Sequence, residues 1–231
     1  WTLLKLAYDV AVSEPTAAHD VPFGWIERSA DGREVPTHMW MDVTGHAPDG
    51  SGAMLGAALL NDGKYGCDVT ESVMRLTVLR SPPYAYHEPH PHGAKQRYDW
   101  IDQGAQEFNV VIRPHLGPWQ EAGVVARARQ LNQPPPLITM HAHGGDRPPL
   151  ASLLALSAEA MELTACKVAE DGRGIIARAA DRYGQGSSGQ IRVGGQEFPL
   201  TLAPFEVKTL RFTQVGGAWQ SSACDMLERP L

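Results

Sequence analysis

The sequence predicts an all-β protein: an antiparallel β-sandwich followed by a smaller β-sandwich domain. Short runs that are apolar, or that alternate apolar and polar residues, recur along the chain and are typical of strands. Turns rich in Gly, Pro and Asp separate these runs at fairly regular spacing. Only one stretch has the spacing of apolar residues that an amphipathic helix needs.

The first part of the chain predicts a series of strands. An alternating pattern or a short apolar run marks each of them, at residues 3–12, 21–28, 40–43, 54–60, 73–79 and 108–112. Asp31-Gly32 predicts a turn, because glycine supplies the positive φ that tight turns need. Ser81-Pro82-Pro83 ends the run at 73–79, since proline cannot donate to a strand ladder. We interpret residues 84–100, with their Pro-flanked histidines, as a long loop.

The one predicted helix covers residues 120–130, with Val124, Val125 and Ala128 on one side. Proline- and glycine-rich segments then bracket residues 137–143, which we interpret as a strand between linkers. A domain boundary is therefore placed here, giving a large sandwich at 1–147 and a smaller β domain at 148–231. In the second domain the strands are expected at 161–169, 174–180, 190–193, 198–202 and 207–212.

Composition limits the classes of function. The chain of 231 residues is 43% hydrophobic and 20% charged, as in an ordinary globular protein with a core. A net charge of −6 argues against nucleic acid or an anionic membrane as partner, because both need clustered Lys and Arg. Cys67, Cys166 and Cys224 are too few and too scattered for a disulfide framework or a zinc site, which favours a reducing, cytoplasmic location.

The chain shows neither a long apolar run that would span a membrane nor a targeting segment at its start. It opens on Trp1, without Met, already inside a strand-like pattern. We therefore expect a piece of a longer protein. Strand edges separated from an upstream partner would also be sticky, so self-association into homo-oligomers is expected.

Two histidine groups could bind a metal. His87, His90 and His92 lie two and three residues apart in the proline-rich loop, but their spacing matches no recognised ligand pattern. His141 and His143 would share one face of the predicted strand, as in some cupin-like sites, although no third ligand can be identified. Ordinary surface histidines explain both groups, so no metal site is assigned to this chain.

The most informative segment is the turn at 59–66, with the sequence LLNDGKYG. Asn61 and Asp62 are typical turn residues that bond their own backbone. Lys64 and Tyr65 beside them could instead contact a sugar, through hydrogen bonds and ring stacking. The chain has no GxSxG elbow and no phosphate-binding glycine motif, so nucleophilic or nucleotide chemistry has no support.

At this turn the sequence resembles the α-mannosidases of glycoside hydrolase family 38. The runs LLNDGKYGCDV at 59–69 and MRLTVLRSP at 74–82 closely resemble the family's LLNDxKYGxDV and LRLTLLRSP signatures. Further ordered matches are LKLAY, PFGWIER, VP, WMD, DQG, EF, RPHLG, CKVAEDG and PFEVKTLR, which together cover nearly the whole chain. One departure is the DMLERPL segment at 225–231, which follows PFEVKTLR here and precedes it in the family.

The resemblance implies a fold and a role. In the family a β/α catalytic barrel and a three-helix bundle precede β-sandwich domains, so this chain would begin inside the large supersandwich. A zinc ion on the catalytic domain holds the mannose, and two carboxyl groups perform retaining hydrolysis of α-mannoside glycans. None of those residues maps onto this chain, which is expected to be inactive alone and to pack on the catalytic and helical domains.

The same resemblance implies that the β region lends side chains to the rim of the active site. The candidates are Asn61, Asp62, Lys64 and Tyr65 of the turn, with Asp102 of the 102–107 stretch behind them. Two alternatives stay open: a free-standing carbohydrate-binding sandwich, and a cupin-like metalloenzyme that uses His141 and His143.

Overall fold

The protein is described by a computed structural model that covers residues 2–83, 97–146, 148 and 150–231. The chain divides into two compact units. Unit 1 consists of Trp1–Val21 and Ile26–Pro136, and unit 2 of Pro22–Trp25 and Leu137–Leu231. The sequence-based boundary at 147/148 falls later in the chain than the break between Pro136 and Leu137.

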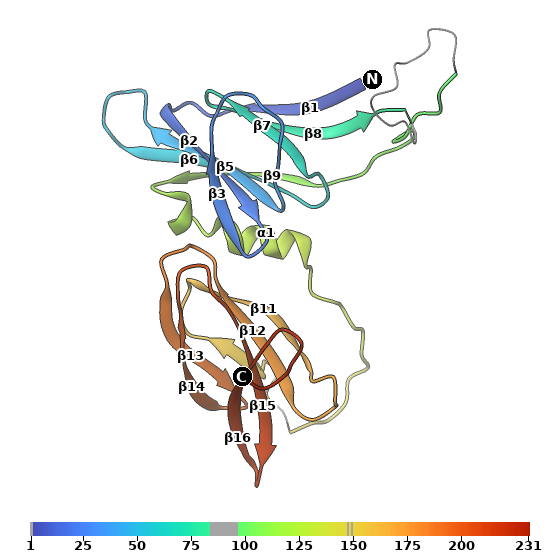
Figure 1. Cartoon of the computed structure of the whole chain (residues 1–231), viewed down its shortest axis with the longest axis vertical. Helices are drawn as coiled ribbons and strands as arrows, with labels where there is room; N and C mark the ends of the chain where they lie inside the picture. Colours follow the sequence, from blue (N-terminus) through green and yellow to red (C-terminus); the bar gives the residue numbers. More distant parts are fainter. Residues whose placement is uncertain (1, 84–96, 147, 149) are drawn as a thin grey trace. The chain divides into compact units, whose positions relative to one another are not determined.

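Unit 1 is built on two antiparallel sheets (Figure 1). The four-stranded sheet has the order β1-β8-β7-β4, formed by β1 (Thr2–Asp9), β8 (Val73–Ser81), β7 (Gly66–Thr70) and β4 (Val35–Pro36). The five-stranded sheet has the order β3-β2-β5-β6-β9, formed by β3 (Gly24–Arg28), β2 (Ser13–Val21), β5 (Trp40–His46), β6 (Met54–Asn61) and β9 (Val110–Leu116).

The core of unit 1 fills the space between these two sheets. Apolar side chains from alternate positions of both sheets form one cluster, which includes Met41, Val43, Leu59, Met74 and Leu76, all fully buried. Two facing sheets with inward alternate residues define a β-sandwich. The predicted sandwich is confirmed.

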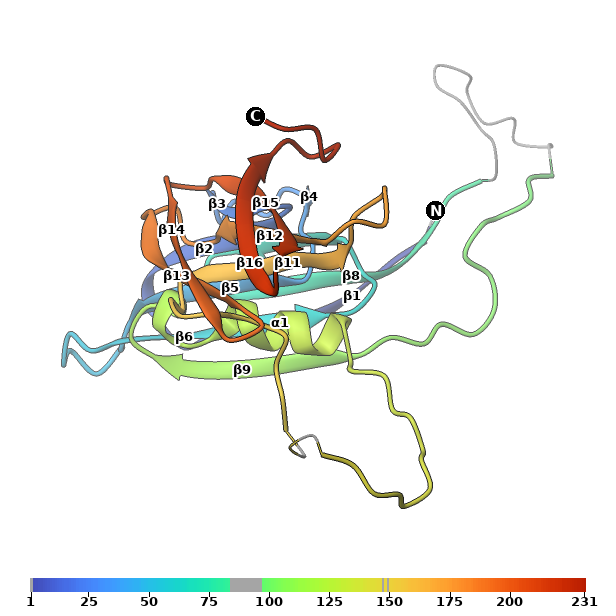
Figure 2. The same cartoon turned by 90° about the horizontal axis from the view of Figure 1, so that it is seen from below.

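A helix covers the outer face of the five-stranded sheet over β5 and β6, so these two central strands are largely buried on both sides. A 3₁₀ turn (Trp119–Glu121) leads into α1 (Val124–Asn132), which lies along the sheet beside β6 (Figure 2). Trp40 of β5 packs on Trp119 with ring centroids 4.6 Å apart. The predicted buried side of the helix is confirmed at Val124, Val125 and Ala128.

Unit 2 is a second, smaller arrangement of two antiparallel sheets. One has the order β10-β13-β14, from β10 (Leu154–Leu156), β13 (Ser187–Val193) and β14 (Gln196–Leu202). The other has the order β11-β12-β15-β16, from β11 (Met161–Val168), β12 (Ile175–Asp181), β15 (Val207–Val215) and β16 (Ala218–Cys224). Its core contains Ile191, Val193 and Leu202 together with Phe212, which meets Phe198 edge to face at 5.2 Å.

Several predicted elements differ from the structure. The helix is shorter than 120–130 because Gly123 takes a left-handed φ of 67° and separates the 3₁₀ turn from α1. The expected strand at 21–28 is broken at Pro22-Phe23, where β2 turns into β3. The sequence analysis missed β2 because Glu14 has a positive φ and because the buried residues His19 and Asp20 are polar.

The predicted strand at 137–143 is wrong. These residues form no strand, and Leu137, Ile138 and Met140 are 99%, 81% and 69% exposed. None of these described residues pairs with another strand, and the three prolines at 134–136 that precede them cannot donate ladder hydrogen bonds. Apolar side chains without a pairing partner do not form a strand.

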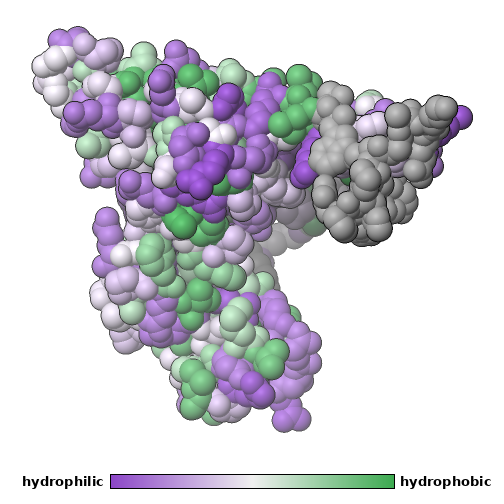
Figure 3. All heavy atoms as spheres, turned by 45° about the horizontal axis from the view of Figure 1, so that its top comes forward, coloured by the Kyte–Doolittle hydropathy of each residue, from purple (hydrophilic) through white to green (hydrophobic). Residues whose placement is uncertain are grey.

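The surface of the described residues is mixed. On the face seen in Figure 3, hydrophobic residues occur in separate patches among hydrophilic ones. Within the part of the chain that the structure describes, no helix combines the length and apolar character needed to cross a membrane. Self-association stays a prediction.

Candidate functional site

A groove lined by both charged and apolar residues lies at one end of unit 1, where the turn between β6 and β7 meets the start of β7 and the end of β8. Its volume is about 510 Å³, within the usual range of ligand sites. The lining residues come from four segments of the sequence: Glu34, Val35, Pro36, Gly63, Lys64, Tyr65, Gly66, Thr77, Val78, Leu79, Arg80, Asp102 and Gln106. The groove thus gathers three of the five predicted rim residues: Lys64, Tyr65 and Asp102.

Asn61 shapes the turn that carries two of these residues. It ends β6 and is buried, and its Oδ1 accepts hydrogen bonds from the backbone N–H groups of Gly63 (3.1 Å) and Lys64 (2.7 Å). Its Nδ2 donates to the carbonyl of His38 at 3.2 Å. This is the Asx-type turn that Asn favours, and the side-chain amide makes three protein contacts. Asn61 is not among the residues that line the groove.

Asp62 holds the same turn to the start of β9. Its two carboxylate oxygens accept from the backbone N–H (2.8 Å) and the side-chain amide (2.6 Å) of Asn109. These hydrogen bonds lower the pKa of the Asp62 carboxyl. Asp62 therefore fixes the turn and, like Asn61, is absent from the groove's lining.

Lys64 and Tyr65 present their side chains at the groove. Lys64 Nζ donates to Gln106 Oε1 at 3.0 Å and lies 5.1 Å from the centre of the Phe108 ring. Tyr65 is 58% exposed and its ring stacks on His38 at 6.0 Å between centroids. An exposed aromatic ring with a cation beside it is the kind of surface that binds a sugar by stacking and hydrogen bonds.

Asp102 reaches the groove from the segment that follows β8. Ile101 donates its N–H to Pro82 O (3.1 Å), and Ser81 Oγ donates to Ile101 O (2.9 Å). Asp102 itself has a positive φ of 55°, an uncommon conformation that Asp tolerates better than most residues. The described part of this segment is thus fastened to the end of β8 immediately before Asp102.

The sequence analysis missed two charged residues of the groove, Glu34 and Arg80. Glu34 Oε1 accepts from Thr77 Oγ1 and Glu34 Oε2 from Lys5 Nζ. Lys5 also bonds Asp68, whose other carboxylate oxygen accepts from Arg75 Nε at 2.5 Å. The signal in the sequence was weak, since Glu34 precedes the short Val35-Pro36 strand in a polar stretch without a motif.

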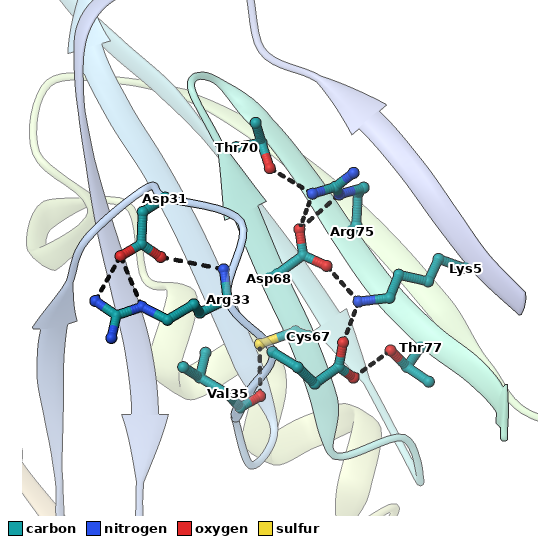
Figure 4. Close-up of polar contacts among 10 residues, drawn as sticks. Lys5, Asp31, Arg33, Val35, Cys67, Asp68, Thr70, Arg75 and Thr77 are labelled. Atoms are coloured by element: carbon teal, nitrogen blue, oxygen red, sulfur yellow. Dashed lines mark hydrogen bonds and ion pairs between the residues drawn. The ribbon is translucent and has the colours of Figure 1, made fainter. Parts of the chain in front are cut away.

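Figure 4 shows this polar network on β1, β7 and β8, with the Lys5 ammonium between the carboxylate of Asp68 and the Glu34 carboxylate that bonds Thr77. Two cations and two carboxylates alternate in the order Arg75, Asp68, Lys5 and Glu34. Asp68 is buried, whereas the Glu34 side chain is 44% exposed. Although burial works in the opposite direction, the hydrogen bonds to Asp68 and Glu34 raise the pKa of Lys5. The network keeps Lys5 charged.

A buried polar cluster lies under α1. His115 of β9 reaches across β6 to Asp42 of β5, with Nε2 2.8 Å from Oδ2, and its Nδ1 is 3.0 Å from the carbonyl of Gly117. A Cβ at Gly56 would lie 2.8 Å from the His115 ring, so the crossing needs glycine there. Burial acts to lower the pKa of His115, but the bonds to Asp42 and Gly117 outweigh it and raise the pKa. This cluster joins three strands and does not line the groove.

For neither histidine group does the described structure show the geometry of a metal site. His87, His90 and His92 lie outside the described residues. His141 and His143 are exposed in the segment that forms no strand, so the shared face assumed for a cupin-like site does not exist. Among the described residues, no three His, Cys, Asp or Glu side chains gather as metal ligands would.

The fold and groove define an all-β region of two sandwich-like units, the first of which carries a groove of about 510 Å³. The pattern of the "Glycosyl hydrolases family 38 C-terminal domain" matches residues 2–92. Human Alpha-mannosidase 2C1 is 30% identical, and Alpha-mannosidase G of Dictyostelium discoideum is 26% identical, over 90% and 91% of this chain. The match spans 21% of each of these relatives, about a fifth of their length.

The solved structure of an alpha-mannosidase from Enterococcus faecalis V583 has the same fold. The likeness has a TM-score of 0.66 at 16% identity and covers 90% of this chain and 25% of that one. Residues 2–92 match the C-terminal domain of glycosyl hydrolase family 38, and over about nine tenths of its length the chain is similar to family alpha-mannosidases. The predicted family resemblance is confirmed.

Proposed function

We propose that the chain works as the C-terminal β region of a longer, zinc-dependent, retaining α-mannosidase, and that its groove forms part of the rim of the mannoside site. One observation carries the proposal: Lys64 and Tyr65 meet Asp102, which is distant from them in the sequence, in one groove on a chain whose relatives are alpha-mannosidases. Asn61 and Asp62 support the rim by holding the turn, rather than by touching a ligand.

The chemistry of the groove suits a neutral sugar. Glu34 and Asp102 offer acceptors to hydroxyl groups, and Lys64 and Arg80 offer donors, so the formal charges balance. Tyr65 adds an exposed ring against which the apolar face of a sugar can stack. A phosphate or nucleotide would instead need an excess of positive charge.

The zinc ion and the two reacting carboxyl groups would belong to another part of the longer polypeptide. Zinc would hold and polarise sugar hydroxyls, and a carboxylate pair would perform retaining hydrolysis. Within the described residues no ligand cluster fits zinc. Glu34 is committed to Lys5 and Thr77, a setting that favours a fixed acceptor over a proton donor. The part assigned to this chain is to bind and orient the sugar.

A comparison of two proteins tests the proposal: the complete polypeptide loaded with zinc, and the 231-residue chain alone. With an aryl α-mannoside as substrate, the complete polypeptide is expected to release the aryl group, and the chain alone is expected to release none above the buffer rate. Turnover by the purified chain would contradict the proposal. A complete polypeptide that binds mannosides without turnover would favour the alternative, a carbohydrate-binding sandwich.

A further inference from the structure

The Glu34 carboxylate is bonded from two strands, and it is held more firmly than a surface carboxylate usually is. Thr77 of β8 and Lys5 of β1 each hold one carboxylate oxygen. Long charged side chains at a surface normally keep their freedom, because ordering them costs entropy. Here Lys5 is itself held by the buried Asp68, so the carboxylate of Glu34 has one defined place.

Gly66 of β7 makes room for this carboxylate. A Cβ built on Gly66 would lie 2.6 Å from Glu34 Oε1 and 3.3 Å from Thr77 Cβ. Gly66 has no positive φ that would otherwise demand glycine. Glycine here is therefore explained by the close approach of Glu34, and any larger residue would displace the carboxylate.

The held carboxylate still has capacity for a ligand. An ionised carboxylate offers about four acceptor positions, of which Thr77 and Lys5 use two. The Glu34 side chain is 44% exposed and lines the groove beside Tyr65 and Lys64. A fixed acceptor with free lone pairs next to an exposed ring is suited to a pair of sugar hydroxyls.

We propose that Glu34 is a sugar-binding residue that accepts hydrogen bonds from the hydroxyl groups of an α-mannoside, and that Lys5, Asp68 and Arg75 are positioning residues that hold its carboxylate. The inference rests on the proposed function of the groove and adds the residue that orients the sugar. Glu34 is expected to bind the ground state and the transition state equally well, because the reacting carboxyl groups are proposed to lie in another part of the polypeptide.

Kinetics of the complete polypeptide on an aryl α-mannoside test this inference. Glu34→Gln keeps the shape but weakens the acceptor and its bond to Lys5, so KM should rise about tenfold with kcat changed less than about twofold. Gly66→Ala keeps every charge and displaces the carboxylate, and Lys5→Met releases it. Gly66→Ala and Lys5→Met should therefore each raise KM, as Glu34→Gln does. Glu34→Gln combined with Lys5→Met should be no worse than Glu34→Gln alone, because Lys5 acts through Glu34.

Glu27→Gln is the matched control, an exposed glutamate of β3 away from the groove, and should leave KM and kcat unchanged. Thermal unfolding of each variant shows whether a change in KM comes from lost stability. Lys5→Arg keeps the positive charge, so its KM should be closer to the wild-type value than the KM of Lys5→Met. If the wild type hydrolyses the mannoside and Glu34→Gln has an unchanged KM, this inference is overturned while the proposed function stands. If the wild type hydrolyses no mannoside, the proposed function fails and the inference with it.

Discussion

Replacing Asp68 by alanine is expected to lower the free energy of unfolding of unit 1 by about 3 kcal/mol, because removing one partner of a buried ion pair leaves the others unpaired. Asp68 is 1% exposed and bonds both Lys5 and Arg75. The positive charges that remain are partly exposed and can regain water, which keeps the expected loss at the lower end of the usual range. Hydrogen exchange of amide groups in β7 and β8 measures this loss without assuming that both units unfold together.

The neighbouring Asp31 supplies the control. It pairs with Arg33 at 2.6 Å on the surface (Figure 4), and the Arg33 side chain is 80% exposed. Asp31→Ala should therefore destabilise unit 1 much less than Asp68→Ala, because water screens an exposed ion pair. Equal effects of the two substitutions would contradict the view that Asp68 is the buried centre of the network.

Acid is expected to destabilise unit 1 through His19. The imidazole is 1% exposed, and among the described residues its ring nitrogens bond no side chain; only the weak opposing effect of the Ala17 backbone favours its charged form. Burial, followed by the nearby charge of Arg28, lowers the pKa of His19 from 6.5 to about 4. The unfolded chain therefore binds a proton below pH 6.5 that the folded chain does not, and stability falls as the pH drops from 6.5 to 4. The shift of 6.5 to about 4 corresponds to a loss of about 3 kcal/mol.

His19→Leu should remove most of this slope, since leucine suits the buried position and does not titrate. The measurement is hydrogen exchange of β2 and β5 amide groups at a series of pH values between 4 and 6.5. His141→Leu, at an exposed histidine, should keep the slope of the wild type. An unchanged slope in His19→Leu would show that other groups cause the acid sensitivity.

The fold was predictable where side chains alternate cleanly. β8 shows strict alternation of buried and half-exposed residues, and β6 is a plain apolar run, so both were predicted nearly to their ends. β2 was not predicted, because its buried end includes His19 and Asp20 and its start contains a bulge around Glu14. The apolar residues at 137–140 led to a predicted strand that does not form, because a strand needs a pairing partner that no local pattern specifies.

The candidate site was predictable in part, for a related reason. The turn motif predicted Lys64 and Tyr65, and the family resemblance added Asp102. The motif and the resemblance could not distinguish residues that face the groove from Asn61 and Asp62. The Asn61 side chain bonds the backbone of the turn, and the Asp62 side chain bonds Asn109. Neither the motif nor the resemblance predicted Glu34. Its position depends on the bond from Lys5 and on the space at Gly66, which exist only once the strands have paired.

The most direct test of the account is a structure of the longer polypeptide proposed above, prepared with zinc and with an unreactive α-mannoside. The account predicts that the sugar lies at the groove, with hydroxyl groups within hydrogen-bond distance of Glu34 and its ring near Tyr65. A mannoside that is bound with no residue of this groove in contact, or a groove covered by another part of the polypeptide, would contradict it.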